Sequence, residues 1–369
     1  MTSHTLISTV GTSLLTNLEN LRRAPDAGVE PLLRAYDARR WKELAEGLHA
    51  RGPDARVCGA EVNSIHDLLT RGLLQAPPFA LHFCLSDTER GRMTGEILRH
   101  YFESLGQQVR LHAIEGLQDD NPGRFRTEGL RNLARKVGEI VRQTGDPMYV
   151  AINATGGYKA QIAIAVLIGQ AMGLPVFYKH ELFPEIIAFP PMPLSFDYDL
   201  LGRHADVLDE LEREGVVEMP EGQVDDALRV LLEEAEGSDG KTLWALAPIG
   251  QIYLEGFRQR YPVEKTLPSA ATNRSAPTYG NDHHYPNGFK EYVNKVWRDN
   301  GYIITCHSIS YHAQSAIRDR VFYVASDGQI IGEYRKGGDG ARFAIMTTAT
   351  TAAQKAAVVA HLNQKYGRE

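Results

Sequence analysis

The clearest structural signal in the sequence is Met148-Tyr-Val-Ala-Ile152, a short apolar run that ends in the loop Asn153-Ala-Thr-Gly-Gly-Tyr-Lys159. A helical pattern follows this loop, from Lys159 to Met172. An apolar strand, a loop of small polar residues and a helix in this order are typical of one strand–helix unit of a parallel sheet. The stretch therefore predicts an α/β fold around it.

Three further apolar runs repeat this signal in the same part of the chain. Residues 4–10 and 80–85 each end in a loop rich in Gly, Ser, Thr or Asp, and residues 175–178 form the third run. Helical patterns lie between the runs, so the strands are expected to be joined by crossover connections and to run mostly parallel. Residues 1–198 are therefore predicted to form a Rossmann-like α/β domain.

The middle of the chain has a different character. Residues 200–240 carry 13 acidic and 3 basic residues in largely helical patterns, and residues 263–287 are rich in proline and small polar residues. Such a charge run is usually a solvated face. Residues 199–287 are therefore predicted to form an acidic connector, helical or winged-helix-like, with a linker at its end.

The last part of the chain predicts a small α+β domain. The turn Ser326-Asp-Gly328 separates two runs rich in β-branched and aromatic residues, which is a strong hairpin signal. A helical pattern opens this part at Phe289, and another closes it from Thr351 to Tyr366. The third predicted domain covers residues 288–369.

Composition excludes several classes of protein. The net charge is −6, from 40 basic and 46 acidic residues, which argues against a protein that is basic overall. The three cysteines, Cys58, Cys84 and Cys306, match neither a disulfide framework nor a zinc spacing. No apolar run is long enough to cross a membrane, and no secretory signal is visible. We expect a cytoplasmic protein that does not contact a membrane.

The loops at the strand ends are the candidate ligand site of the first domain. Ligands of open α/β sheets bind outside the carboxyl ends of the strands, and glycines and helix starts there favour anions. Neither the dinucleotide motif G-x-G-x-x-G nor the P-loop motif is present, which disfavours a dehydrogenase and an NTPase. Each loop taken alone also fits an ordinary strand–helix turn. The candidate ligand-binding residues are Ser8, Thr9, Gly11, Thr12, Ser13, Ser86, Asp87, Thr88, Asn153, Thr155, Gly156, Gly157 and Lys159.

Taken together, these loops carry a family resemblance. The segments Ile7–Leu14, Leu85–Gly91 and Ile152–Ala160 resemble the signatures of CARF domains, the CRISPR-associated Rossmann-fold sensors of type III systems. Residues 177–181 and 189–194 are similar to the stretch that closes this domain in one large CARF subfamily. The resemblance covers about 200 residues and combines several motifs in the same order.

The resemblance implies a ligand and an assembly. CARF domains bind cyclic oligoadenylates, which are rings of adenosines with a phosphate at every link. A two-fold ring such as cyclic tetra-adenylate is expected to be met by a homodimer in which each subunit supplies the same loops. Some such domains also cleave the ring slowly. Here Lys159 would stabilise the charge that develops, and Ser8 or Thr9 would orient the attack.

The C-terminal domain resembles the second half of RelE-type mRNA interferases in the order of its basic strands, hairpin and closing helix. Those proteins cut mRNA in the ribosomal A site without a metal, so the resemblance implies an endoribonuclease with mRNA and the ribosome as partners and no cofactor. The strand before the last helix departs from the pattern, because it ends in Thr347-Thr348 where a basic residue is frequent. Cations and aromatic rings would hold the RNA, and histidines would transfer protons near pH 7. The candidate catalytic residues are Arg320, Tyr323, Arg335, Lys336, Arg342, His307 and His312.

Two alternatives remain open for the C-terminal domain. In a PD-(D/E)xK nuclease, Asp319 and Glu333 would hold Mg²⁺ or Mn²⁺ for hydrolysis of RNA or single-stranded DNA. The E-x-K element then reads Glu333-Tyr334-Arg335, in which arginine cannot exchange a proton as lysine does. The other alternative is a regulator that responds to the ring and binds nucleic acid without cutting it. A HEPN ribonuclease is disfavoured, because that domain is helical and this part of the chain is rich in strands.

Overall fold

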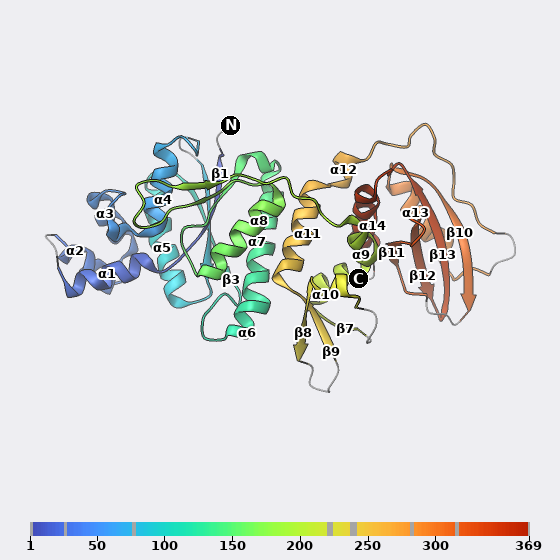
Figure 1. Ribbon diagram of the computed structural model, residues 1–369, viewed down its shortest axis with the longest axis horizontal. Helices are drawn as coiled ribbons and strands as arrows, with labels where there is room; N and C mark the ends of the chain where they lie inside the picture. Colours follow the sequence, from blue (N-terminus) through green and yellow to red (C-terminus); the bar gives the residue numbers. More distant parts are fainter. Residues whose placement is uncertain are drawn as a thin grey trace. The chain divides into compact units, whose positions relative to one another are not determined.

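The computed structural model describes residues 3–25, 28–75, 79–219, 224–236, 242–280, 284–313 and 317–367. It divides into two compact units (Figure 1). Unit 1 comprises Met1–Leu194 and Ala247–Gln259, and unit 2 comprises Ser195–Leu246 and Arg260–Glu369. The α/β class predicted from the sequence is confirmed. The first segment of unit 1 ends at Leu194, close to residue 198, where the predicted first domain ends. The helical segment Ala247–Gln259 lies beyond this boundary but also belongs to unit 1.

Unit 1 is built on a six-stranded sheet in the order β3-β2-β1-β4-β5-β6. The first five strands are parallel, and β6 pairs with β5 in the antiparallel direction. This order, with β1 at the centre, is that of a Rossmann-like sheet, whose ligand site lies where the strand order reverses. The strands are β1 (Thr5–Thr9), β2 (Ala80–Ser86), β3 (Gln108–Ile114), β4 (Val150–Asn153), β5 (Val176–Tyr178) and β6 (Ile187–Phe189).

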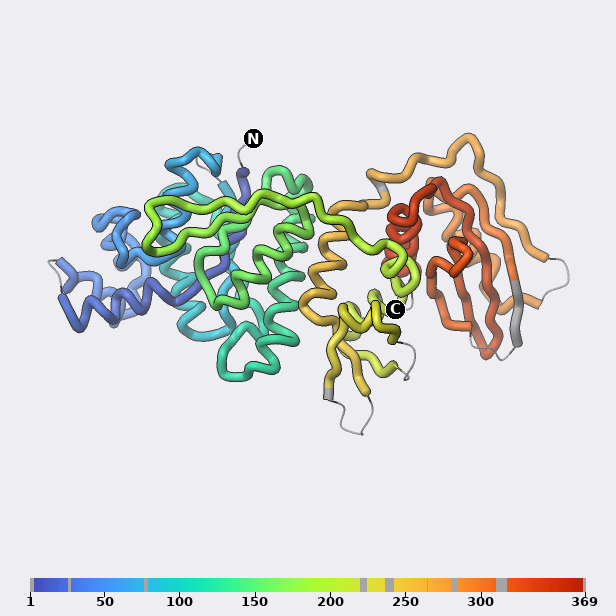
Figure 2. The backbone as a smooth tube through the Cα atoms, in the orientation of Figure 1, coloured from blue at the N-terminus to red at the C-terminus, as the bar shows by residue number. Residues whose placement is uncertain are grey.

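Helices join the strands of unit 1 and cover the sheet. Helix α8 packs against β5, where a Cβ on Gly169 would lie 2.2 Å from a Val176 methyl carbon. Helix α11 belongs to the same unit (Figure 2). Its buried residue Glu255 forms a salt bridge with Arg142 of α7. The helices of eight or more residues are α1 (Ser13–Arg23), α2 (Glu30–Asp37), α3 (Trp41–Arg51), α4 (Gly59–Thr70), α5 (Glu89–Glu103), α7 (Leu130–Thr144), α8 (Lys159–Met172) and α11 (Pro248–Arg260); shorter turns are Arg56–Cys58, α6 (Pro122–Arg124), Phe125–Gly129 and Pro147–Tyr149.

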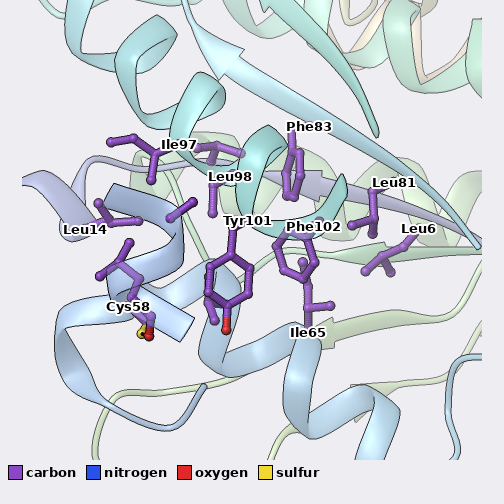
Figure 3. Packing of buried hydrophobic residues seen from close by; sticks show 14 of the residues in the cluster. Leu6, Leu14, Cys58, Ile65, Leu81, Phe83, Ile97, Leu98, Tyr101 and Phe102 are labelled. Carbon is purple, nitrogen blue, oxygen red and sulfur yellow. Dashed lines mark hydrogen bonds between the residues drawn. The ribbon is translucent and has the colours of Figure 1, made fainter. Parts of the chain in front are cut away.

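The main core of unit 1 lies between the sheet and helices α1, α4 and α5 (Figure 3). Leu6 of β1 and Phe83 of β2 are fully buried there, together with Ile65 of α4 and Leu98 of α5. Burying side chains of this size stabilises the fold by about 1.5–3 kcal/mol each. This packing fixes α4 beneath the strand ends that carry the candidate ligand loops.

Unit 2 begins with the acidic segment. Its helix α9 (Tyr198–Glu214) is followed by a three-stranded antiparallel sheet in the order β7-β9-β8. A short helix, α10 (Asp226–Arg229), precedes β8, so the element order is helix, strand, helix and a two-stranded wing. The strands are β7 (Val216–Glu218), β8 (Leu232–Glu236) and β9 (Thr242–Leu246).

The C-terminal part of unit 2 is a four-stranded antiparallel sheet in the order β10-β13-β12-β11. One face of the sheet packs against α13 and α14 around Phe289, Phe322 and Phe343, which are fully buried. The predicted hairpin is present as the antiparallel pair of β11 and β12. The elements are α12 (Val263–Thr266), α13 (Phe289–Asp299), β10 (Ile303–Ala313), β11 (Val321–Val324), β12 (Ile330–Lys336), β13 (Asp339–Thr347) and α14 (Ala352–Tyr366).

Within the residues that the structure describes, no helix is both long and apolar enough to cross a membrane.

Candidate functional sites

The carboxyl ends of β1 and β4 lie side by side, because Ser8 pairs with Asn153 in the parallel register. The two loops that follow these strands are therefore adjacent. A Cβ atom at position 11 would lie 2.8 Å from the Gly157 amide nitrogen, so only glycine allows the loops to approach this closely. The register thus brings together the two loops that the sequence singled out.

Three of the predicted ligand residues in these loops are buried. Ser8, Thr9 and Asn153 are at most 1% exposed. The Asn153 amide donates to the Ser8 hydroxyl at 3.1 Å, and the Thr9 hydroxyl donates to the Gly156 carbonyl at 2.5 Å. Buried polar groups are stable only when they are hydrogen-bonded in this way. These side chains therefore brace the loops from below.

The partly exposed residues of the two loops form the outer surface of this site, whereas the predicted ligand residue Gly156 is buried. Gly11, Thr12 and Ser13 are partly exposed, as are Thr155 and Gly157. Helices α1 and α8 both begin here, and the first N–H groups of a helix have no partner within it. The exposed side chain of Lys159 stands at the first position of α8. This arrangement can bind an anion such as a phosphate.

The loop after β2 uses its polar groups internally. The Thr88 hydroxyl caps α5 by accepting from the Gly91 amide at 3.0 Å, and it also bonds to the Ser86 hydroxyl at 2.9 Å. Asp87 pairs with Arg92 at 2.5 Å. In this structure the predicted ligand residues Ser86, Asp87 and Thr88 therefore stabilise the start of α5.

Helix α4, which no sequence motif pointed to, lies directly beneath the first two loops. Its residue Glu61 accepts a hydrogen bond from the Gly11 amide at 2.7 Å. Its residue Ser64 accepts one from the Asn153 amide at 2.9 Å. A signal for this helix was present in the sequence, because polar residues recur at every third position, Glu61, Ser64 and Asp67, next to the apolar Val62 and Ile65. All five residues are buried.

A second site lies in unit 2, where a cavity of about 880 Å³ opens between α9 and the edge of the C-terminal sheet. Acidic side chains of α9, among them Asp206 and Glu210, face basic side chains from β12 and from the loop before β11 across this space. His204, which no sequence motif pointed to, also lines the cavity. Its ring bonds to Asp225 at 3.1 Å. The basic residues of the lining are Arg203, Arg213, Arg318, Arg320, Arg335 and Lys336.

The structure brings three of the predicted catalytic residues together in this cavity: Arg320, Arg335 and Lys336. In the part of the chain that the structure describes, the exposed side chains of Arg335 and Lys336 form no ion pair, whereas Arg320 pairs with Asp319 at 3.7 Å. The backbone of Arg320 has a φ of +53°, a left-handed conformation that is unusual for a residue with a side chain. Arg335 and Lys336 are therefore the cations most available to an incoming phosphate.

Two further predicted residues, Tyr323 and Arg342, belong to a hydrogen-bond network around the buried Glu333. The Glu333 carboxylate accepts from the Arg342 guanidinium at 2.7 Å and from the Tyr323 hydroxyl at 3.4 Å. Its other oxygen accepts twice from Arg318, from the backbone and the side-chain nitrogen, each at 3.1 Å. Burial raises the pKa of Tyr323, so its hydroxyl remains protonated at neutral pH. The carboxylate thus has both oxygens occupied by protein donors.

The predicted histidines lie on β10, at the opposite edge of the sheet from β11. The ring of His307 bonds to the Thr278 hydroxyl at 2.6 Å, and its backbone pairs with Ala344. Strands β10 and β12 are two strand spacings apart, which is roughly 10 Å. The backbone of His312 pairs with Gly340, but its side chain lies outside the described residues. The structure therefore does not bring His307 to the cavity.

Comparisons with known proteins place part of this chain in a family context. Residues 56–192 match the model of a family described as CRISPR-associated protein (Cas_APE2256). This match covers the chain from α4 to β6, and so includes β4, the loop before α8 and Lys159. A search of the curated proteins found no match.

Several solved structures match this chain at low similarity, among them two that align with most of its length. One is Can2 from Sulfobacillus thermosulfidooxidans in complex with cyclic tetra-adenylate, with 11% identity, 94% of this chain and 74% of that chain covered, and a TM-score of 0.27. The other is protein VC1899 from Vibrio cholerae, with 9% identity, 93% and 77% covered, and a TM-score of 0.23. TM-scores this low do not establish a common fold.

Proposed function

We propose that this chain is a CRISPR-associated effector in which a cyclic oligoadenylate sensor, unit 1, controls a metal-independent endoribonuclease in unit 2. The observation that carries the proposal is the anion site at the adjacent starts of α1 and α8, where Lys159 is exposed within the segment that matches the CRISPR-associated family. The resemblance of these loops to CARF domains indicates a cyclic oligoadenylate as the ligand. The helix starts and Lys159 would bind the phosphates of that ligand.

In this proposal the ring phosphates contact the outer surface of the two loops. The backbone N–H groups at Thr12 and Ser13 and the Lys159 ammonium supply positive potential. The Thr155 hydroxyl instead braces the loop, because it donates to the Asn153 side chain at 2.6 Å and accepts from the Lys179 amide. A two-fold ring such as cyclic tetra-adenylate would be bound by a homodimer, each copy giving the same contacts. Because Ser8 and Thr9 are buried, we assign them to bracing the loop and leave charge stabilisation in any slow ring cleavage to Lys159.

The proposed effector reaction needs no metal. The 2′-hydroxyl of the RNA gives its proton to water as its oxygen attacks the adjacent phosphorus, and the leaving 5′-oxygen takes a proton from water. This produces a 2′,3′-cyclic phosphate and a 5′-hydroxyl. The guanidinium of Arg335 and the ammonium of Lys336 would stabilise the negative charge that develops on the phosphate. We propose mRNA on the ribosome as the substrate, which the RelE-like order of elements supports.

The metal-dependent alternative is less favoured by the surroundings of its carboxylates. Glu333 is 2% exposed and accepts hydrogen bonds from two arginines, so a cation would have to displace both guanidinium groups. Asp319 is occupied by the Arg335 amide at 3.3 Å and by the Arg320 side chain. These contacts favour a reaction carried by the arginines and lysine.

The proposal is tested by adding cyclic tetra-adenylate to a reconstituted translation system with the purified protein and mapping RNA ends. We expect ring-dependent cuts confined to translated codons, with 5′-hydroxyl ends. Ring-dependent cutting of naked nucleic acid only with Mg²⁺ or Mn²⁺, leaving 5′-phosphates, would instead establish the metal nuclease. Ring-dependent binding of nucleic acid without any cuts would establish the regulator.

A contact within unit 2 suggests how the nuclease is restrained before the ring binds. Arg318 pairs with Asp206 of α9 as well as with Glu333, and Asp206 is 8% exposed. The acidic face of α9 thereby competes with RNA phosphates for the cavity. The substitution Asp206→Asn is expected to raise cleavage without the ring about tenfold, because it removes one charge-assisted contact worth about 1.5–3 kcal/mol.

The matched control is Asp199→Asn, an exposed carboxylate in the first turn of the same helix that does not line the cavity. Both variants are assayed without and with the ring in the translation system. If Asp206→Asn leaves the ring-free rate at the wild-type level while the protein stays folded, the restraint does not come from this contact.

A further inference from the structure

A buried carboxyl group lies directly beneath the proposed ring site. Glu61 of α4 is completely buried, and one of its oxygens, Oε1, accepts from the Gly11 amide at 2.7 Å. Its other oxygen, Oε2, has no hydrogen-bond partner among the described residues. An unpaired buried carboxylate oxygen costs free energy, so a group kept in this state calls for an explanation.

The same carboxyl group also contacts the second loop. A Cβ atom on residue 156 would lie 2.0 Å from Glu61 Oε1 and 2.9 Å from the Gly11 nitrogen. No residue larger than glycine therefore fits at this junction. The loop after β1, the loop after β4 and the Glu61 side chain meet at one point.

Helix α4 continues this contact toward the neighbouring strands. Ser64 bonds to Asn153 at the end of β4, and Asp67 bonds to the Lys179 ammonium, just after β5, at 3.0 Å. The Lys179 amide in turn donates to the Thr155 hydroxyl at 3.0 Å. A row of polar residues on one helix thus ties together the ends of three parallel strands.

We propose that Glu61 is a positioning residue of the ring site, holding the loop after β1 against the loop after β4 so that both helix starts face one ligand phosphate. This inference rests on the proposed function of unit 1. Glu61 itself does not touch the ring, since Gly11 and Gly156 lie between them. Its effect on the ring is therefore exerted through the position of the loops and through its charge.

The charge of Glu61 makes the role measurable. Burial raises the pKa of Glu61 to about 7, while the hydrogen bond from Gly11 opposes this shift. The residues of the two loops that pack on Glu61 are uncharged. The charged groups nearest to it are Lys159 at the start of α8 and the pair of Asp67 with Lys179. Asp67 lies about 9 Å from Glu61 along the axis of α4.

Ring phosphates bound above the carboxyl group would disfavour its ionised form and raise its pKa further. Binding is then coupled to proton uptake, so the ring binds more tightly as the pH falls through 7. For the wild-type protein we expect the dissociation constant of cyclic tetra-adenylate to fall three- to tenfold per protomer between pH 8 and pH 6.

The test compares wild type with Glu61→Gln and Glu61→Ala by titration calorimetry with cyclic tetra-adenylate at pH 6, 7 and 8, with thermal unfolding as a check on folding. Glutamine keeps an oxygen that accepts from Gly11 but carries no charge. We expect Glu61→Gln to bind at pH 8 as tightly as wild type does at pH 6, with most of the pH dependence gone. Glu61→Ala is expected to bind at least tenfold more weakly.

The outcomes separate this inference from the function on which it rests. If wild type does not bind the ring at any pH, the sensor assignment fails and the role of Glu61 fails with it. If wild type binds and a folded Glu61→Ala binds as tightly, the positioning role is wrong while the sensor stands. If wild type binds and Glu61→Gln shows the same pH dependence, the coupling of ring binding to the charge of Glu61 is wrong. Because glutamine is isosteric with glutamate, this result holds even if the alanine variant does not fold.

Discussion

Replacing Arg335 and Lys336 together by alanine is expected to lower ring-stimulated mRNA cleavage at least a hundredfold. Both side chains line the cavity of unit 2 and form no ion pair among the described residues. Removing one group that stabilises developing charge typically costs about 10²–10³ in rate. Because both side chains are exposed at the end of β12, their loss should leave the free energy of unfolding nearly unchanged.

The measurement is the rate of appearance of cut mRNA in the translation system at saturating ring. Arg298→Ala is the matched control, because Arg298 is an exposed basic residue of α13 in the same unit but outside the cavity. Ring affinity should be unchanged in both variants. If the double variant cuts at the wild-type rate, the cavity is not the site of cleavage. The next candidate is then Arg342, a partly exposed basic residue of β13.

The parallel sheet of unit 1 could be predicted from four strand–loop signals, and β1, β2, β4 and β5 all lie where those signals are. Strand β3 was missed because it is an edge strand that is largely half-exposed, so Gln108–Ile114 alternates polar with apolar residues and lacks a continuous apolar run. The signal used was specific for central strands, which are covered on both faces.

The direction of each polar side chain could not be predicted from the loops. Ser8 and Ser13 look alike in sequence, because a hydroxyl group suits both ligand contact and internal bracing. In the structure Ser8 and Asn153 bond to each other beneath the loop, whereas Lys159 is exposed and the partly exposed Ser13 accepts from the Ala60 amide at 3.2 Å. That distinction depends on the register between β1 and β4, which are far apart in the sequence.

Long-range contacts limit prediction in the C-terminal sheet as well. Successive side chains of a strand point to opposite faces of the sheet, and the structure buries Phe322 in the core while Tyr323 joins the Glu333 network. Arg320 precedes β11 in a left-handed conformation, so the alternation does not reach it. The pairing of Arg318 with Asp206 joins two segments with no local pattern in common.

Replacing Lys159 by alanine is expected to raise the concentration of cyclic tetra-adenylate needed for half-maximal cleavage about a hundredfold or more. A hydrogen bond between a lysine and a phosphate contributes about 1.5–3 kcal/mol. A two-fold ring on a homodimer loses this contact twice, which gives about 3–6 kcal/mol in total. Lys159 is exposed at the first position of α8, so the loss should not unfold unit 1.

The form of the activation curve is what distinguishes a ligand contact from damage to the protein. If Lys159 binds the ring, the alanine variant reaches the wild-type maximal rate at high ring concentration, because the residues of the cavity in unit 2 are intact. Lys159→Arg retains the charge and should recover most of the affinity, whereas Lys42→Ala, an exposed lysine on α3, should behave as wild type. An unchanged half-maximal concentration in Lys159→Ala would contradict the assignment of this loop to the ring, because Lys159 is the exposed cation at the start of α8.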